Sequence, residues 1–172
     1  MDLRPPVTDR DHRRGPDDAP VTLVAYGDYE CPYTRRAQRE IDDILTLRGD
    51  RLRYVYRHFP LSKIHPHAAK AAEAAEAAAA QGRFWEYHAV LFPRQRALEV
   101  ADLVRYAGEL GLDTDRFERE VLADAHAQRI REDVRSGAGS GVQGTPTLFV
   151  NGIRRDDPFH LEELLADVDR AL

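Results

Sequence analysis

The single cysteine of this chain, Cys31, lies where a strand is expected to give way to a helix. The apolar run Val21–Tyr26 before it is typical of a buried strand, and apolar residues after it recur at helical spacing. A thiol at such a junction faces the unpaired N–H groups of the first helical turn and the positive end of the helix dipole. Both favour the thiolate over the thiol. We therefore predict that Cys31 is a nucleophile able to attack disulfides.

Thr34 occupies the position, three residues after Cys31, at which a dithiol enzyme holds its second cysteine. One cysteine in 172 residues excludes an intramolecular disulfide and a cysteine-based metal cluster. The site can therefore attack a disulfide but cannot close one on itself. We expect an external thiol to resolve the mixed disulfide. The Thr34 hydroxyl, one helical turn from the sulfur, is a candidate hydrogen-bond partner for the thiolate.

Charged residues flank the thiol, and each has two interpretations. Glu30 is either a proton shuttle for Cys31 or a solvated side chain. Arg35 and Arg36 either attract an anionic thiol such as glutathione or are plain solvated charges of the first helical turn.

The pattern around this site predicts a strand–helix–strand unit. A strand over Val21–Gly27 leads into a helix from Cys31 to about Arg48, and the alternating segment Arg51–Arg57 follows as a second strand. Such a unit implies a parallel pair of strands with a right-handed crossover. The segment before it, Met1–Ala19, is expected to be an extended lead-in.

The second half of the chain begins with helices and ends with a hairpin. Residues from His65 to about Ser136 have helical character, and the last of these helices is expected to break up in the glycine-rich segment Gly137–Gly141. Thr145–Gly152 is a β run closed by Asn-Gly, a strong hairpin signal. Asp157-Pro158 has the residues preferred at the start of a helix, so a final helix is expected there.

Five segments together resemble the DsbA-like group of the thioredoxin superfamily. They are Asp11–Gly15, Gly27–Tyr33, Arg57–Leu61, Phe84–His88 and Gly144–Thr147. The resemblance covers most of the chain, and closely similar domains occur fused behind sodium–proton antiporters. It implies an α/β thioredoxin-like fold with an inserted helical subdomain. It also implies a single domain over residues 1–172, with its core at 20–62 and 142–172 and the helical insert at 63–141.

The resemblance also implies roles for individual residues. Cys31 matches the attacking cysteine, and Pro32 and Tyr33 match the dipeptide that tunes it. Pro146 matches the cis-proline that faces the cysteine, and Thr145 before it offers backbone groups to an extended substrate. Thr34 departs from the dithiol pattern of the group, so the site Cys31–Thr34 is expected to work as a monothiol.

Composition restricts the classes of partner. Charged residues make up 32% of the chain and the net charge is -5, which argues against nucleic acid as a partner. Met1–Gly15 has no apolar core of a secretory signal, and no stretch approaches the roughly 20 apolar residues of a membrane span. We expect a cytoplasmic protein that has no membrane partner, metal site or bound cofactor.

Three functions fit these residues. The first is a monothiol thiol-disulfide oxidoreductase, in which Cys31 forms mixed disulfides with protein or small-molecule disulfides and glutathione is the candidate co-substrate that resolves them. The second is a redox-inactive thioredoxin-like module that binds a peptide or protein beside Pro146. The third, less favoured, is a glutathione-dependent isomerase or transferase.

Overall fold

A five-stranded sheet forms the centre of the computed structural model, which describes residues 2–156 and 160–171. The strands lie in the order β1–β3–β2–β4–β5. β2 and β3 are parallel, whereas every other neighbouring pair is antiparallel. Their bounds are β1 His12–Arg14, β2 Val21–Gly27, β3 Leu52–His58, β4 Thr147–Val150 and β5 Ile153–Arg154. The expected α/β class and the parallel strand–helix–strand unit are both confirmed.

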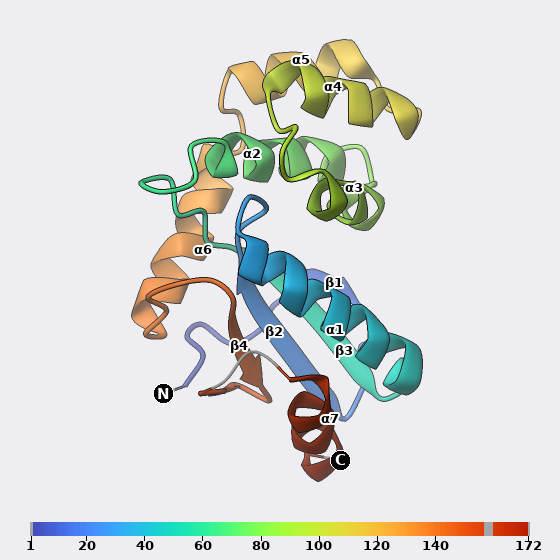
Figure 1. Cartoon of the computed structure of the whole chain (residues 1–172), viewed down its shortest axis with the longest axis vertical. Coiled ribbons are helices and arrows are strands. Elements are labelled where there is room, and N and C mark those ends of the chain that lie inside the picture. The colour runs from blue at the N-terminus through green and yellow to red at the C-terminus, as the bar shows by residue number, and fades with distance from the viewer. Residues whose placement is uncertain (1, 157–159, 172) are drawn as a thin grey trace.

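Seven α-helices and one short 3₁₀ helix are seen in the described part of the chain. Their bounds are α1 Pro32–Arg48, α2 Ala68–Ala79, α3 Phe84–Leu91, η1 Phe92–Arg94, α4 Val100–Glu109, α5 Thr114–Leu122, α6 Ala127–Gly139 and α7 Leu161–Arg170. α1 and α7 lie together at the sheet, and α2 to α5 form a separate layer beyond its end (Figure 1). None of these helices combines the length and the apolar composition that a membrane span requires.

The two faces of the sheet bury different sets of side chains, because neighbouring residues of a strand point to opposite faces. One face belongs to a large core that continues into α1, the helical layer and α7, and includes Leu23 and Tyr54. The other face contributes Val24 and Tyr26 to a smaller cluster with Leu3 and other residues. The sheet is therefore covered on both sides, and the end of β2 is held firmly in the interior.

The structure differs from two of the sequence-based expectations, and a third expectation lies outside the described residues. The lead-in is not wholly extended, because His12–Arg14 within it pairs with β3. α6 does not break up at Gly137 but continues to Gly139. The expected helix start at Asp157-Pro158 lies outside the described residues, and the described helix α7 begins at Leu161.

Candidate active site

Cys31 occupies the N-cap position of α1, directly after the loop that follows β2. Its backbone is extended (φ -75°, ψ 121°), and Pro32 is the first helical residue. Pro is well suited to this position because it has no N–H to leave unpaired. The Cys31 carbonyl accepts a hydrogen bond from the Arg35 N–H at 3.1 Å, which closes the first turn. The thiol is free and Cys31 is only 2% exposed.

The sulfur lies next to the Thr145–Pro146 segment, in which the resemblance expects a cis-proline facing the cysteine. Cys31 Sγ donates a hydrogen bond to the Thr145 carbonyl oxygen at 3.4 Å, across 114 residues of sequence. The Thr145–Pro146 peptide bond is cis, and Pro146 is buried. The Thr145 hydroxyl is buried and has no hydrogen-bond partner among the described residues. A backbone carbonyl of the segment that leads into β4 therefore lies next to the thiol.

Thr34 lies beneath the turn, with 3% of its surface exposed. Its Oγ1 accepts a long hydrogen bond, 3.4 Å, from the Asp28 N–H. No hydrogen bond joins Thr34 to the sulfur, which instead donates to the Thr145 carbonyl oxygen. Pro32 and Tyr33 are exposed, Tyr33 by 61%, so they form the outer surface of the turn.

Asp28, which sequence reasoning missed, organises the loop before the cysteine. Its carboxylate is fully buried and accepts hydrogen bonds from the Glu30 N–H, the Leu61 N–H and His65 Nδ1, each at 2.8 Å. Its backbone carbonyl accepts from the Cys31 N–H at 3.1 Å. One carboxylate thus ties the cysteine turn to the segment after β3. The sequence signal was the Gly27-Asp28 pair at the end of a buried strand.

Gln95, also missed, ties the helical layer to the same turn. Its side-chain amide donates to the carbonyl oxygens of Tyr29 and Cys31, both at 2.8 Å. Gln95 follows η1, more than 60 residues from either carbonyl. No local sequence pattern identifies such a contact.

Glu30 is paired with a histidine and is not free to serve the thiol. Its carboxylate accepts from His67 Nδ1 at 2.8 Å and from the His67 N–H at 2.7 Å. The other ring nitrogen of His67 contacts Glu99 at 3.0 Å. The hydrogen bonds to Glu30 and then Glu99 raise the pKa of His67 above its ordinary value. Glu30 is therefore a paired side chain, 16% exposed, and is neither a solvated charge nor placed by any contact to serve the thiol.

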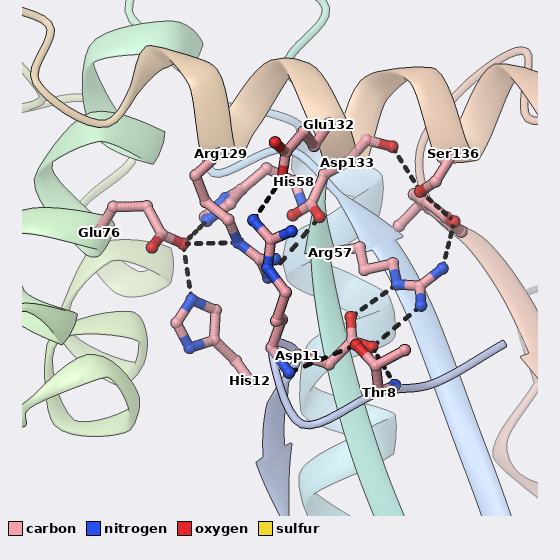
Figure 2. A network of polar contacts seen from close by, with 12 residues as sticks. Thr8, Asp11, His12, Arg57, His58, Glu76, Arg129, Glu132, Asp133 and Ser136 are labelled. Carbon is pink, nitrogen blue, oxygen red and sulfur yellow. Dashed lines mark hydrogen bonds and ion pairs between the residues drawn. The ribbon is translucent and has the colours of Figure 1, made fainter. Parts of the chain in front are cut away.

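A second polar cluster joins the helical layer to the sheet (Figure 2). Glu76 Oε1 on α2 contacts His12 Nε2 at 2.6 Å and His58 Nε2 at 2.7 Å. Burial raises the pKa of Glu76, but these two hydrogen bonds outweigh burial and hold it below its ordinary value. The three ligand atoms lie within 4.8 Å of one another, a spacing compatible with a metal ion. Arg129 already supplies positive charge 4.0 Å from the carboxylate, so the arrangement favours an ion-pair cluster.

The sequence matches a known protein family and part of several longer relatives. A family model described as Thioredoxin matches residues 7–170. A Na(+)/H(+) antiporter NhaA 3 of Salinispora tropica is 53% identical over 170 residues, which cover 98% of this chain and 26% of the antiporter. An NhaA 1 antiporter of Mycolicibacterium vanbaalenii is 46% identical over 165 residues, which cover 95% of this chain and 27% of that protein. The chain thus spans about a quarter of the length of these relatives.

Solved structures share the architecture over nearly the whole chain. BdbD from Bacillus subtilis superposes with a TM-score of 0.87 at 21% identity, covering 96% of this chain and 95% of BdbD. A thioredoxin-like oxidoreductase from Silicibacter pomeroyi gives 0.84 at 29% identity, with 95% and 93% covered. The thiol-disulfide exchange protein alpha-DsbA2 from Wolbachia pipientis gives 0.82 at 21% identity, with 94% and 87% covered. The family match and the shared architecture together show that this chain belongs to the thioredoxin family, with a DsbA-like fold.

Proposed function

We propose that this protein is a monothiol thiol-disulfide oxidoreductase in which Cys31 is the nucleophile. The observation that carries the proposal is the position of the sulfur. It lies at the N-cap of α1 and 3.4 Å from the Thr145 carbonyl, with threonine in place of a second cysteine. The oxidoreductase class of the solved neighbours supports the general chemistry, and the DsbA-like fold supports thiol-disulfide exchange.

The reaction proceeds in two exchanges. The Cys31 thiolate attacks one sulfur of a substrate disulfide, a bond forms between the two sulfurs, and the second substrate sulfur leaves as a thiolate. An external thiolate, of which glutathione is the proposed example, then attacks the mixed disulfide and releases Cys31. Each step forms one S–S bond and breaks one, so no other oxidant is needed. Because this cycle needs a pool of small reduced thiols, we propose a cytoplasmic location.

The residues around the sulfur have separate parts in this proposal. Pro32 and Tyr33 form the exposed surface on which a substrate lies, and Thr145 and Pro146 border the sulfur from the other side. The Thr145 backbone is proposed to face an extended substrate, whereas the Thr145 hydroxyl is buried. Thr34 prevents closure of an internal disulfide, so resolution depends on the external thiol.

One observation favours the redox-inactive binding module as a second candidate. Cys31 is 2% exposed and its thiol is already hydrogen-bonded, which is also the situation of an inert structural cysteine. In that case the surface beside Thr145 and Pro146 would hold a peptide without exchange.

Thr34→Cys separates the two candidates. Thr34 is one helical turn from Cys31, so the new pair has the spacing of a dithiol site, subject to the Cα separation limit of about 7 Å for a disulfide. We expect the variant to form the internal disulfide and to reduce insulin with dithiothreitol at least about tenfold faster than the parent. The parent should show activity mainly in a glutathione-coupled assay.

Thr34→Ser is the matched control, because it keeps a hydroxyl and should behave as the parent does. If the Thr34→Cys disulfide forms without a gain in insulin reduction, the surface around Cys31 is not built for exchange and the binding module is the better account.

A further inference from the structure

An arginine-rich pocket adjoins the cysteine turn. It has a volume of about 410 Å³ and lies between α1 and the segment that follows η1. Its charged and polar lining consists of Arg35, Arg94, Gln95, Arg96, Arg105 and Tyr106. Four arginines around one small pocket contrast with the net charge of -5 of the whole chain.

Two of these arginines are held in place by carboxylates and an aromatic ring. Arg94 pairs with Glu109 at 2.6 Å, and Arg105 pairs with Asp102 at 2.8 Å. Both guanidinium groups lie over the ring of Tyr106, 4.5 and 4.9 Å from its centroid. These contacts fix the wall of the pocket but neutralise only part of its charge.

The other two arginines, Arg35 and Arg96, have no ion-pair partner among residues 2–156 and 160–171. Arg36, by contrast, does not line the pocket and pairs with Glu40 at 3.4 Å. The pocket therefore carries a surplus of about two positive charges, because its four cations face two paired carboxylates. Of the two arginines that the sequence offered for attracting an anionic thiol, Arg35 lines this pocket and Arg36 does not.

The pocket shares its wall with the turn that holds the thiol. The Arg35 N–H and the Gln95 amide both donate to the Cys31 carbonyl, at 3.1 and 2.8 Å. A molecule bound in the pocket therefore lies beside two residues, Arg35 and Gln95, that hold the backbone of Cys31 in place. Its volume is within the range of roughly 300–1,000 Å³ that is usual for small-molecule sites.

We propose that this pocket binds the carboxylates of the small anionic thiol or disulfide that exchanges with Cys31, a class represented by glutathione. The inference rests on the proposed exchange function and names the site that selects the co-substrate. Guanidinium groups match carboxylates through two parallel hydrogen bonds, so the unpaired Arg35 and Arg96 are the selecting residues. In the exchange itself, the Cys31 thiolate bonds to one sulfur of glutathione disulfide and the other glutathione leaves as a thiolate.

The test compares three small disulfides of different charge. These are anionic glutathione disulfide, neutral hydroxyethyl disulfide and cationic cystamine. The rate of mixed-disulfide formation at Cys31 is measured by intact mass spectrometry at low and high salt. We expect the parent protein to favour glutathione disulfide, and this preference to shrink at high salt.

In the double variant Arg35→Gln/Arg96→Gln, the reaction with glutathione disulfide should be slower by about tenfold or more. The reaction of the neutral disulfide should stay within about twofold of the parent rate.

Arg119→Gln, at an exposed position of α5 outside the pocket, is the matched control and should change none of the rates. Equal rates for all three disulfides in the parent, or an unchanged glutathione rate in the double variant, would overturn the pocket assignment and leave the exchange function standing. Failure of the folded parent to react with any disulfide would instead overturn the exchange function, and the pocket assignment with it.

Discussion

At the scale of single residues, the candidate site is held through the backbone of Cys31 rather than through its sulfur. Asp28 and Gln95 bind the N–H and the carbonyl of the turn, whereas the sulfur itself has one long hydrogen bond, to Thr145. The position of the thiol is therefore fixed while its sulfur is only weakly bound. This is the arrangement that a nucleophile needs, because an attacking sulfur must give up its existing partner at little cost.

The buried ion pair of Asp11 and Arg57 gives a pH-dependent prediction at this scale. Two hydrogen bonds of 2.8 and 3.0 Å join the side chains, which are 4% and 3% exposed (Figure 2). Burial raises the pKa of Asp11, but the hydrogen bonds from Arg57 and from the Thr8 N–H outweigh it, so the pKa is below its ordinary value. A lowered carboxyl pKa contributes stability above the unfolded value of about 3.9, and this stability is lost as the pH falls through the folded value.

Asp11→Asn should therefore lower the free energy of unfolding by about 3–5 kcal/mol at pH 7, because it leaves the buried charge of Arg57 without its counter-charge. The difference from the parent should narrow below about pH 4, where the parent loses the same charge. Urea midpoints between pH 7 and pH 3 measure both effects. Asp43→Asn, at an exposed position of α1, is the control and should show neither. A difference that stays constant with pH would contradict the account.

At the scale of elements, α6 depends on one glycine for its close approach to the sheet. A Cβ atom at Gly137 would lie 2.7 Å from the ring of Phe59 and 3.1 Å from that of Tyr26. At Gly139, in the same helix, a Cβ atom would meet nothing within 4 Å. The two glycines thus offer a matched pair of substitutions.

Gly137→Ala should lower the free energy of unfolding by about 1–3 kcal/mol, because the helix or the Phe59 ring must shift. Gly139→Ala should leave stability unchanged or raise it by up to about 1 kcal/mol, since alanine restricts the unfolded chain. Guanidinium denaturation curves measure both effects. If the m-value is the same in the parent and the two variants, a shift of the midpoint reports a change in stability. Equal effects at the two positions would mean that α6 is not packed as described.

The elements also show what the sequence could predict and why the rest was hidden. The strand Val21–Gly27 was predicted with its bounds because its apolar, β-branched run is a local signal. The hairpin at Asn151-Gly152 was predicted for the same kind of reason, and both residues have positive φ values, 47° and 81°. β1 was missed because His12–Arg14 has no alternating apolar pattern and is a strand only through its pairing with β3.

The residues of the candidate site also fall into those that the sequence indicated and those that it did not. The resemblance of two short motifs placed Pro146 opposite Cys31, and in the structure the residue before it, Thr145, accepts the hydrogen bond from the sulfur at 3.4 Å. Gln95 was hidden because its contacts depend on how the helical layer packs against α1. Its neighbours in sequence carry no sign of that packing.

At the scale of the whole molecule, polar contacts join the helical layer to the sheet. Glu76 contacts His12 and His58, and the Trp85 indole N–H donates to the Arg13 carbonyl at 3.0 Å. Trp85 is the only tryptophan, so it reports on this boundary. The division of the chain into a core at 20–62 and 142–172 and an insert at 63–141 stays a prediction, and unfolding can test whether the parts behave as one domain.

We expect a single cooperative transition in guanidinium. Trp85 fluorescence and the far-ultraviolet circular dichroism of the helices should change together, as in a two-state domain. Two separated transitions, with helical signal lost before or after the Trp85 change, would show that the helical layer unfolds as an independent unit.

The central claim is that the molecule has one exchanging sulfur and needs an outside thiol to release it. Incubation of the native protein with oxidised glutathione, followed by intact mass spectrometry, tests this most directly. The account predicts one glutathione adduct per chain, absent in Cys31→Ser and removed by reduced glutathione. A native protein whose Cys31 reacts with iodoacetamide but never acquires the adduct, or whose adduct survives reduced glutathione, would contradict it.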